Sequence, residues 1–215
     1  MNLKIQTVVT EPFQENCYLI WQEEYPGTII IDPGGSFSEI CSKIKEYNLL
    51  PAAILNTHAH LDHVGAVALL KQTYDIPFYL HSEEKIILEH FSESRRLFGL
   101  PPEKEPVVDI WFNNESPLTV ADFRFEIVPA PGHTPGSTCL KLGEHIFSGD
   151  TLFKGSIGRT DLPGGNSPQL QASLSSLMRN FSPDVIIHTG HGPDTTLGQE
   201  IRQNPFLIYI NNKLN

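Results

Sequence analysis

The 215-residue chain has few cysteines, a deficit of cations and no long apolar run, and each shortage excludes a class of protein. Its three cysteines, Cys17, Cys41 and Cys139, are too few for a disulfide framework and are typical of a reducing cytoplasm. Lys and Arg total 15 against 25 Asp and Glu, a formal charge of −10, without the basic stripe of a nucleic-acid-binding protein. No apolar segment approaches the ~20 residues of a membrane span, and the first residues lack the apolar core of a secretory signal. We therefore expect a cytoplasmic protein without nucleic-acid or membrane partners.

The composition is that of a globular chain. Hydrophobic residues make up 40% and charged residues 19%, which is enough apolar material to close a core. The length is close to that of one domain, so we expect a single domain over residues 1–215. Cys17 and Cys139 lie in apolar, strand-like surroundings, and this context predicts buried thiols without a chemical role.

The order of the periodic segments predicts a mixed α/β chain with helices covering sheets. A polar, helical insertion is expected over residues 82–106, and the tail from Gln199 is expected to be helical. A helix is expected after Gly35, capped by Ser36 or Ser38, and another at residues 64–74. A third helix is expected to begin at its cap, Ser167, and to end near Asn180. Strands are expected at residues 3–9, 17–21, 28–31, 52–56, 77–80, 123–128, 137–142, 145–148 and 185–188.

The densest group of chemically active side chains lies between a predicted strand and a predicted helix, in the motif His58-x-His60-x-Asp62-His63. At the frequencies of His and Asp in this chain, such a motif arises by chance in under about one sequence in a thousand. Four such side chains within six residues repel one another as the pH falls. A divalent cation removes that repulsion, since neutral imidazoles and carboxylates are its ligands. The motif therefore predicts a metal site.

One loop cannot surround two cations, so further ligands are expected from other strand ends. Three candidates follow later in the chain, and each lies near glycine: His133, Asp150 and His191. Neighbouring glycines let the backbone turn sharply, so that a side chain can point into a cleft. Taken together with the first motif, these residues predict a site with more than one metal ion.

With these residues in view, the sequence resembles the metallo-β-lactamase-fold hydrolases and, among them, the glyoxalase II-like (hydroxyacylglutathione hydrolase-like) enzymes. The resemblance covers residues 16–193 and includes the runs 148–153 and 158–161. It implies an α/β (α+β) four-layer αββα sandwich. It also implies a first metal ion held by His58, His60 and His133, a second held by Asp62, His63 and His191, and Asp150 between the two.

The resemblance assigns further roles near these ligands. Asp32, at the end of a predicted strand, is expected to orient a ligand histidine without coordinating metal itself. Arg159 is expected to bind the substrate, with a surface arginine as the equal alternative. True metallo-β-lactamases usually lack a histidine at the position of His63, which argues against a β-lactamase. Relatives commonly have proline where Thr189 stands, a departure in the loop that carries His191. Structural or surface roles are expected for the remaining histidines, His81, His90, His145 and His188.

The expected activity is hydrolysis of a small-molecule thioester similar to S-lactoylglutathione, by a hydroxide that bridges two divalent ions. Zinc is the first expectation for the metal, with iron or manganese as alternatives, and Asp62 and Asp150 are expected to orient the hydroxide. Alternatives are an iron-dependent persulfide dioxygenase using His58, His133 and Asp150, a lactone hydrolase, and a non-catalytic metal-binding module. Only 24 residues follow His191, too few for the helical C-terminal domain of full-length glyoxalase II, so weaker discrimination for the glutathione part is expected.

Overall fold

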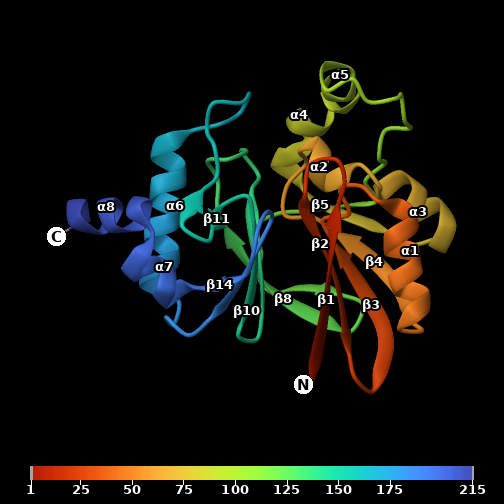
Figure 1. Cartoon of the computed structure of the whole chain (residues 1–215), viewed down its shortest axis with the longest axis horizontal. Coiled ribbons are helices and arrows are strands. Elements are labelled where there is room, and N and C mark those ends of the chain that lie inside the picture. The colour runs from red at the N-terminus through yellow and green to blue at the C-terminus, as the bar shows by residue number, and fades with distance from the viewer. Residues whose placement is uncertain (1, 215) are drawn as a thin grey trace. The chain divides into compact units, whose positions relative to one another are not determined.

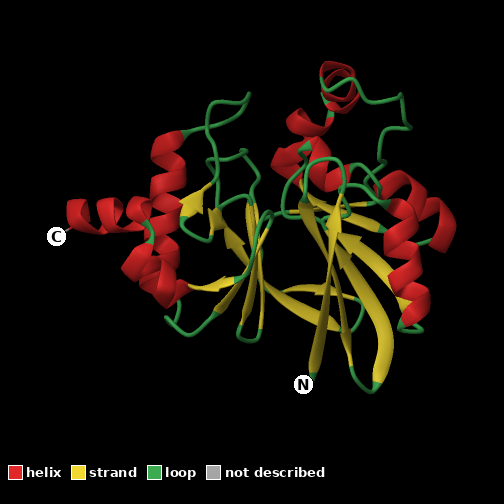
Figure 2. Ribbon diagram, in the orientation of Figure 1, coloured by secondary structure: helices red, strands yellow, loops and turns green. Residues whose placement is uncertain are grey.

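The computed structural model describes residues 2–214 and forms two compact units. Residues up to 113 and 119–123 form the first unit, and residues 114–118 and those from 124 onward form the second. Each unit contains a mixed sheet with helices packed on it, as the ribbons of Figures 1 and 2 show. Sheets covered by helices confirm the predicted α/β class, while the single domain over the whole chain stays a prediction.

The sheet of the first unit has six strands that neighbour one another in chain order. Its first three strands are antiparallel, and each strand from the third to the sixth runs parallel to its neighbour. Parallel neighbours need crossover connections, and these connections carry the helices and the metal-binding motif. The strands are β1 (Leu3–Thr10), β2 (Glu15–Gln22), β3 (Tyr25–Ile31), β4 (Leu50–Leu55), β5 (Phe78–His81) and β6 (Ile110–Phe112).

The longer helices of this unit pack their apolar faces on the sheet. Ile40, Ile44 and Leu70 join the core cluster that contains Leu19 and Ile54 of the strands. The described helices are α1 (Phe37–Glu46), α2 (Leu61–Val64), α3 (Val67–Tyr74), the 3₁₀ helix η1 (Ser82–Glu84), α4 (Lys85–Leu88) and α5 (Phe91–Leu97). The last three lie within the segment 82–106.

Two local predictions for the first unit differ from the structure. The single helix expected at residues 64–74 is wrong, because α2 and α3 are separated at Gly65 and Ala66. The backbone N–H of Ala66 donates to the carbonyl of Pro33 at 2.9 Å instead of continuing the helical bonding. Ser36 lies at the N-cap position of α1, yet its hydroxyl makes no cap hydrogen bond and accepts one from the backbone N–H of Glu11.

Apart from residues 119–123, a second six-stranded sheet and a two-stranded hairpin belong to the second unit. In the larger sheet, β10 and β13 are parallel, and the pairs β8–β9, β9–β10 and β13–β14 are antiparallel. Its order is β14 (Thr195–Thr196), β13 (Ile186–Thr189), β10 (His145–Gly149), β9 (Thr138–Leu142), β8 (Phe123–Pro129) and β7 (Leu118–Val120). The hairpin is formed by β11 (Leu152–Phe153) and β12 (Ser156–Ile157).

Three helices cover this second sheet: α6 (Ser167–Asn180), α7 (Leu197–Gln203) and α8 (Pro205–Leu214). Leu170 and Leu174 of α6 join the same core cluster as Leu207 of α8. The expected cap of α6 is wrong by one residue. Asn166 is the N-cap, its side-chain oxygen accepts the backbone N–H of Gln169 at 3.0 Å, and Ser167 is the first helical residue.

Among residues 2–214, no helix combines the length and the apolar character that spanning a membrane requires.

Candidate metal centre

The predicted ligands of the first unit lie where β4 ends and α2 begins. Residues 57–60 form the connecting loop, and Asp62 and His63 lie on the first turn of α2. A close approach of two backbones shapes this loop, because a Cβ atom on Gly34 would overlap the carbonyl oxygen of Asp62. Only glycine permits this contact. The side-chain amide of Asn56 also donates to the carbonyl of His63 at 2.7 Å.

Asp32 organises this loop from the end of β3. One carboxylate oxygen accepts the backbone N–H of Thr57 at 2.7 Å, and the other accepts the Thr57 hydroxyl at 2.6 Å. The second oxygen also lies 3.1 Å from Nδ1 of His63. A histidine that donates Nδ1–H to a carboxylate presents Nε2 to a metal. The structure thus places Asp32 beside a ligand histidine.

The same carboxylate reaches His58 through a hydroxyl group. Nδ1 of His58 lies 3.1 Å from Oγ1 of Thr57, whose hydrogen is directed to Asp32. The hydroxyl oxygen can therefore accept Nδ1–H of His58, which leaves Nε2 as the coordinating atom. Thr57, which contacts a predicted ligand, was not singled out by sequence reasoning.

The three imidazoles of the motif lie together within the first unit. The ring centroid of His58 is 4.0 Å from that of His63 and 5.0 Å from that of His60. One nitrogen or oxygen atom from each of Asp32, His58 and His63 lies within 4.8 Å of the others. His58 and His63 are buried, whereas His60 and Asp62 are half-buried. Imidazoles that are buried this close together would repel one another if they were protonated. A bound cation keeps them neutral, so their spacing fits a metal site.

Two buried glutamates beside this loop were missed by the sequence analysis. Oε2 of Glu84, in η1, accepts the backbone N–H of Ala59 at 2.7 Å. Oε1 of Glu15 lies 3.9 Å from Nδ1 of His63, and its Oε2 accepts the hydroxyl of Thr10 at 2.7 Å. Burial, above all, holds the pKa of Glu15 well above its usual value. In the sequence, each of these glutamates is only a carboxylate next to an apolar strand segment. Most residues in such positions belong to ordinary turns, so this pattern does not single them out.

The predicted ligands of the second unit surround one carboxylate. Asp150 follows β10, His133 lies in the loop after β8, and His191 follows β13. Oδ2 of Asp150 lies 3.5 Å from Nε2 of His133 and 3.7 Å from Nε2 of His191. Ligand atoms bound at about 2.1 Å to a tetrahedral ion are about 3.4 Å apart. Asp150 therefore lies close enough to each of the two histidines to share a divalent cation with it.

The loop after Asp150 orients His133. Nδ1 of His133 donates to the backbone carbonyl of Arg159 at 2.8 Å, which leaves Nε2 for a metal. A Cβ atom on Gly158 would overlap the carbonyl oxygen of Asp150 and lie 3.3 Å from Nδ1 of His133. Glycine at this position therefore lets the loop close on both ligands.

Thr189 supports the loop of His191. Its hydroxyl donates to the carbonyl of His191 at 2.8 Å and lies 3.3 Å from that of Gly192. A threonine hydroxyl can hold a turn of this kind by bonding the backbone two residues on. The hydrogen bond from Thr189 therefore supports the turn at the position where relatives commonly have proline.

The side chain of Arg159 is exposed and pairs with Asp161 through two hydrogen bonds of 2.7 Å. This pairing raises the pKa of Arg159 and lowers that of Asp161 to about 2. Both groups are solvent-exposed, so the pair contributes little to stability. Arg159 also lines a cavity of about 420 Å³ together with Phe206 and Tyr209 of α8. The residues after His191 therefore contribute to a cavity, and substrate binding by Arg159 stays a prediction.

The histidines outside the ligand set have contacts of their own. Nδ1 of His145 lies 2.9 Å from Nε2 of His188, and Nδ1 of His188 lies 2.8 Å from Asp194. Nδ1 of His81 accepts the backbone N–H of Glu83 and so caps η1. The exposed His90 lies 3.4 Å from the carboxylate of Glu93.

Comparison with known proteins gives consistent matches over nearly the whole chain. The family model described as the Metallo-beta-lactamase superfamily matches residues 10–191. The hydroxyacylglutathione hydrolase GloC of Haemophilus influenzae is 42% identical over 211 residues, which cover 95% of this chain and 98% of that protein. The crystal structure of BLEG-1 B3 metallo-beta-lactamase is 39% identical, with a TM-score of 0.88 and coverage of 95% of this chain and 99% of that chain. The structure of TTHA1623 in a di-iron-bound form is 41% identical, with a TM-score of 0.84 and coverage of 94% and 100%.

Proposed function

This chain belongs to the metallo-beta-lactamase superfamily and is a metallo-hydrolase, and we propose that it hydrolyses thioesters of the S-lactoylglutathione type. One observation carries the proposal: each unit holds histidines around a carboxylate, and the set includes both His63 and Asp150. The 42% identity to a hydroxyacylglutathione hydrolase supports the thioester class.

The proposed cofactor is a pair of divalent ions, with zinc first and iron or manganese as alternatives. The proposed ligand sets are the two that the family resemblance implies, with Asp150 shared between them. The donor types support this assignment, since imidazole and carboxylate suit all three metals. A relative in a di-iron-bound form keeps iron among the candidates.

When bound, two such ions lower the pKa of water and polarise a substrate carbonyl. The chain's own residues supply orientation and charge. Asp32, through the hydroxyl of Thr57, holds His58 in the tautomer that leaves Nε2 available, and its carboxylate lies 3.1 Å from Nδ1 of His63. Asp62 and Asp150 accept hydrogen bonds from the attacking water and aim it at the carbonyl. A thiolate leaves without being protonated, so the reaction needs no further acid from the chain.

The test is an assay of free-thiol release from S-lactoylglutathione by protein reconstituted with zinc, iron or manganese. We expect turnover that Asp150→Asn abolishes and that Asp184→Asn, an exposed aspartate of the same unit, leaves intact. Absence of thiol release with all three metals, in protein that binds them, would refute the thioesterase proposal.

Three other activities are tested in parallel. The 39% identity to a B3 metallo-beta-lactamase favours β-lactam hydrolysis as the second candidate, against the expectation from the sequence. A chromogenic cephalosporin measures it directly. Oxygen uptake with glutathione persulfide identifies the dioxygenase, and a lactone substrate identifies the lactonase. The cytoplasmic location and the absence of nucleic-acid and membrane partners stay predictions from composition.

A further inference from the structure

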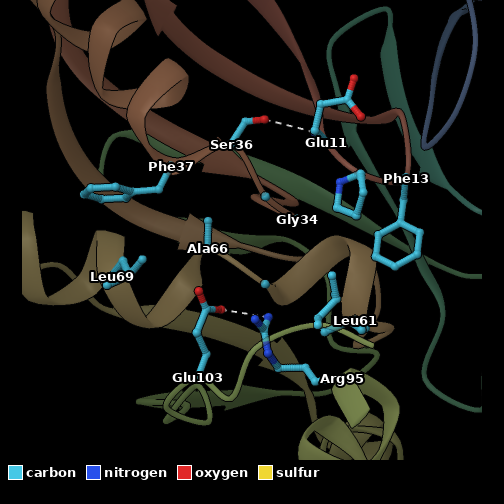
Figure 3. Close-up of a pocket in the computed structure, with 14 residues that line it drawn as sticks. Glu11, Phe13, Gly34, Ser36, Phe37, Leu61, Ala66, Leu69, Arg95 and Glu103 are labelled. Carbon is cyan, nitrogen blue, oxygen red and sulfur yellow. Dashed lines mark hydrogen bonds and ion pairs between the residues drawn. The ribbon is translucent and has the colours of Figure 1, made fainter. Parts of the chain in front are cut away.

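A cavity of about 160 Å³ in the first unit lies outside the ligand set and has no part in the proposed hydrolysis. It is bordered by the turn after β1, the loop after β3, the α2–α3 region and the segment that follows α5 (Figure 3). Its walls combine polar groups with the apolar side chains of Phe13, Phe37, Leu61, Leu69 and Leu100.

Arg95 of α5 brings a cation into this apolar space. Its side chain is only 8% exposed, and its guanidinium carbon lies 5.6 Å from the ring centroid of Phe91. Nε donates to the carbonyl of Pro101 at 2.8 Å, and Nη1 lies 2.7 Å from a carboxylate oxygen of Glu103. Figure 3 shows the guanidinium group between Glu103 and Leu61. Among residues 2–214, no acceptor is bonded to Nη2, whose two N–H groups remain for a ligand.

The N–H groups on Nη2 of Arg95 define the chemistry of that ligand, because solvent reaches them and a ligand can replace the water. A guanidinium group has five N–H donors, and an anionic acceptor forms stronger, charge-assisted hydrogen bonds with it than a neutral one does. A carboxylate satisfies it best, because its two oxygens match the planar guanidinium fork. Glu103, which makes a single contact from a mostly irregular segment, shows that a carboxylate fits against this group.

Charge and shape narrow the ligand further. Glu103 already offsets the charge of Arg95, and the exposed Glu11 adds negative charge at the rim, so a dianion such as phosphate is repelled about twice as strongly as a monoanion. In Figure 3 the carboxylate of Glu11 points away from Arg95, which leaves the approach open to a monoanion. The apolar side chains on one part of the wall can pack against a short hydrocarbon body.

We propose that this cavity binds a small monocarboxylic acid with an apolar body. The carboxylate pairs with Arg95, and the hydrocarbon chain packs against Phe13, Phe37 and Leu69. Glu103 competes with the ligand for the same guanidinium group. Leu61 separates His60 from Asp62, so a bound acid contacts the backbone segment that carries the proposed metal ligands.

The experiment is calorimetric titration of the full-length protein with butanoate and hexanoate, with chloride keeping the ionic strength constant. We expect saturable binding at one site, tighter for hexanoate, with a dissociation constant of about 1 mM or lower. Arg95→Met is expected to weaken hexanoate binding at least tenfold. Arg96→Met is the matched control, because the neighbouring Arg96 side chain is 79% exposed. Glu103→Gln is expected to tighten binding severalfold by removing the competing carboxylate.

Several outcomes would overturn the proposal. These are no binding by the wild-type protein, equal binding by a folded Arg95→Met variant, or a preference for hexylammonium over hexanoate. If Arg95→Met does not fold, Glu103→Gln decides the question, because Glu103 is about one-third exposed and glutamine keeps its shape and one acceptor oxygen for Arg95. Unchanged hexanoate affinity in that variant would show that the Arg95–Glu103 pair is only structural.

Discussion

Glu84→Ala tests whether η1 holds the metal-binding loop in place. The substitution removes the carboxylate that accepts the backbone N–H of Ala59, and Ala59 itself is only 3% exposed. A hydrogen bond to a charged group contributes about 1.5–3 kcal/mol, and a buried N–H left without an acceptor costs about 1–3 kcal/mol. These overlapping effects amount to about 3 kcal/mol. In a chain of this length, that loss lowers Tm by about 6–12 °C.

The loss should also reach the metal site, because Ala59 lies between His58 and His60. Removing a group that supports a metal ligand typically lowers metal affinity about 10- to 100-fold. Competition with a chromophoric chelator measures that affinity, and thermal unfolding of the metal-free protein measures stability independently. Glu84→Gln keeps an acceptor oxygen and should lose about 1 kcal/mol or less.

Glu83→Ala is the matched control, because Glu83 is exposed in the same 3₁₀ helix and should change neither quantity. The reasoning fails if Glu84→Ala unfolds and binds metal like Glu83→Ala. A stability loss at unchanged metal affinity would show that Glu84 stabilises the fold without positioning the ligands.

The site and its surroundings lead to four further predictions. Elemental analysis should find close to two metal ions per chain, and a finding of at most one ion after reconstitution would contradict the shared-ligand assignment. Asp150→Ala should abolish activity, while circular dichroism should show that the fold is retained. One thiol should react readily with a thiol reagent at pH 8, and all three should react after denaturation. Burial raises the pKa of Cys17 and raises that of Cys139 to about 12, whereas Cys41 is partly exposed. Three fast thiols in the folded protein would show that Cys17 and Cys139 are not buried. The ratio of kcat/KM for S-lactoylglutathione to that for short thioesters should stay below about a thousandfold. Arg159 is the cation among the residues that line the cavity near α8, and it is already paired with Asp161. A larger ratio would reveal a dedicated glutathione site.

Much of the fold was readable from local patterns. The long strands and helices have enough residues for their periodicity to show, and their apolar faces form the two core clusters. Strands β6, β7, β11, β12 and β14 have only two or three residues, too few for any period, so the sequence analysis missed them. The break between α2 and α3 was missed because its cause, the contact between Ala66 and Pro33, joins two different loops.

The same distinction applies to the candidate site. The sequence alone predicts the ligand types and their order, because His58, His60, Asp62 and His63 share one short loop and a metal requires such donors. Only the tertiary structure could place the residues that orient them. Asp32 and Thr57 are 25 positions apart, as are Ala59 and Glu84, and each pair meets only because parallel strands end at the same edge of a sheet. A buried carboxylate has no local sequence pattern of its own, since its role is decided by the donor that folding brings to it.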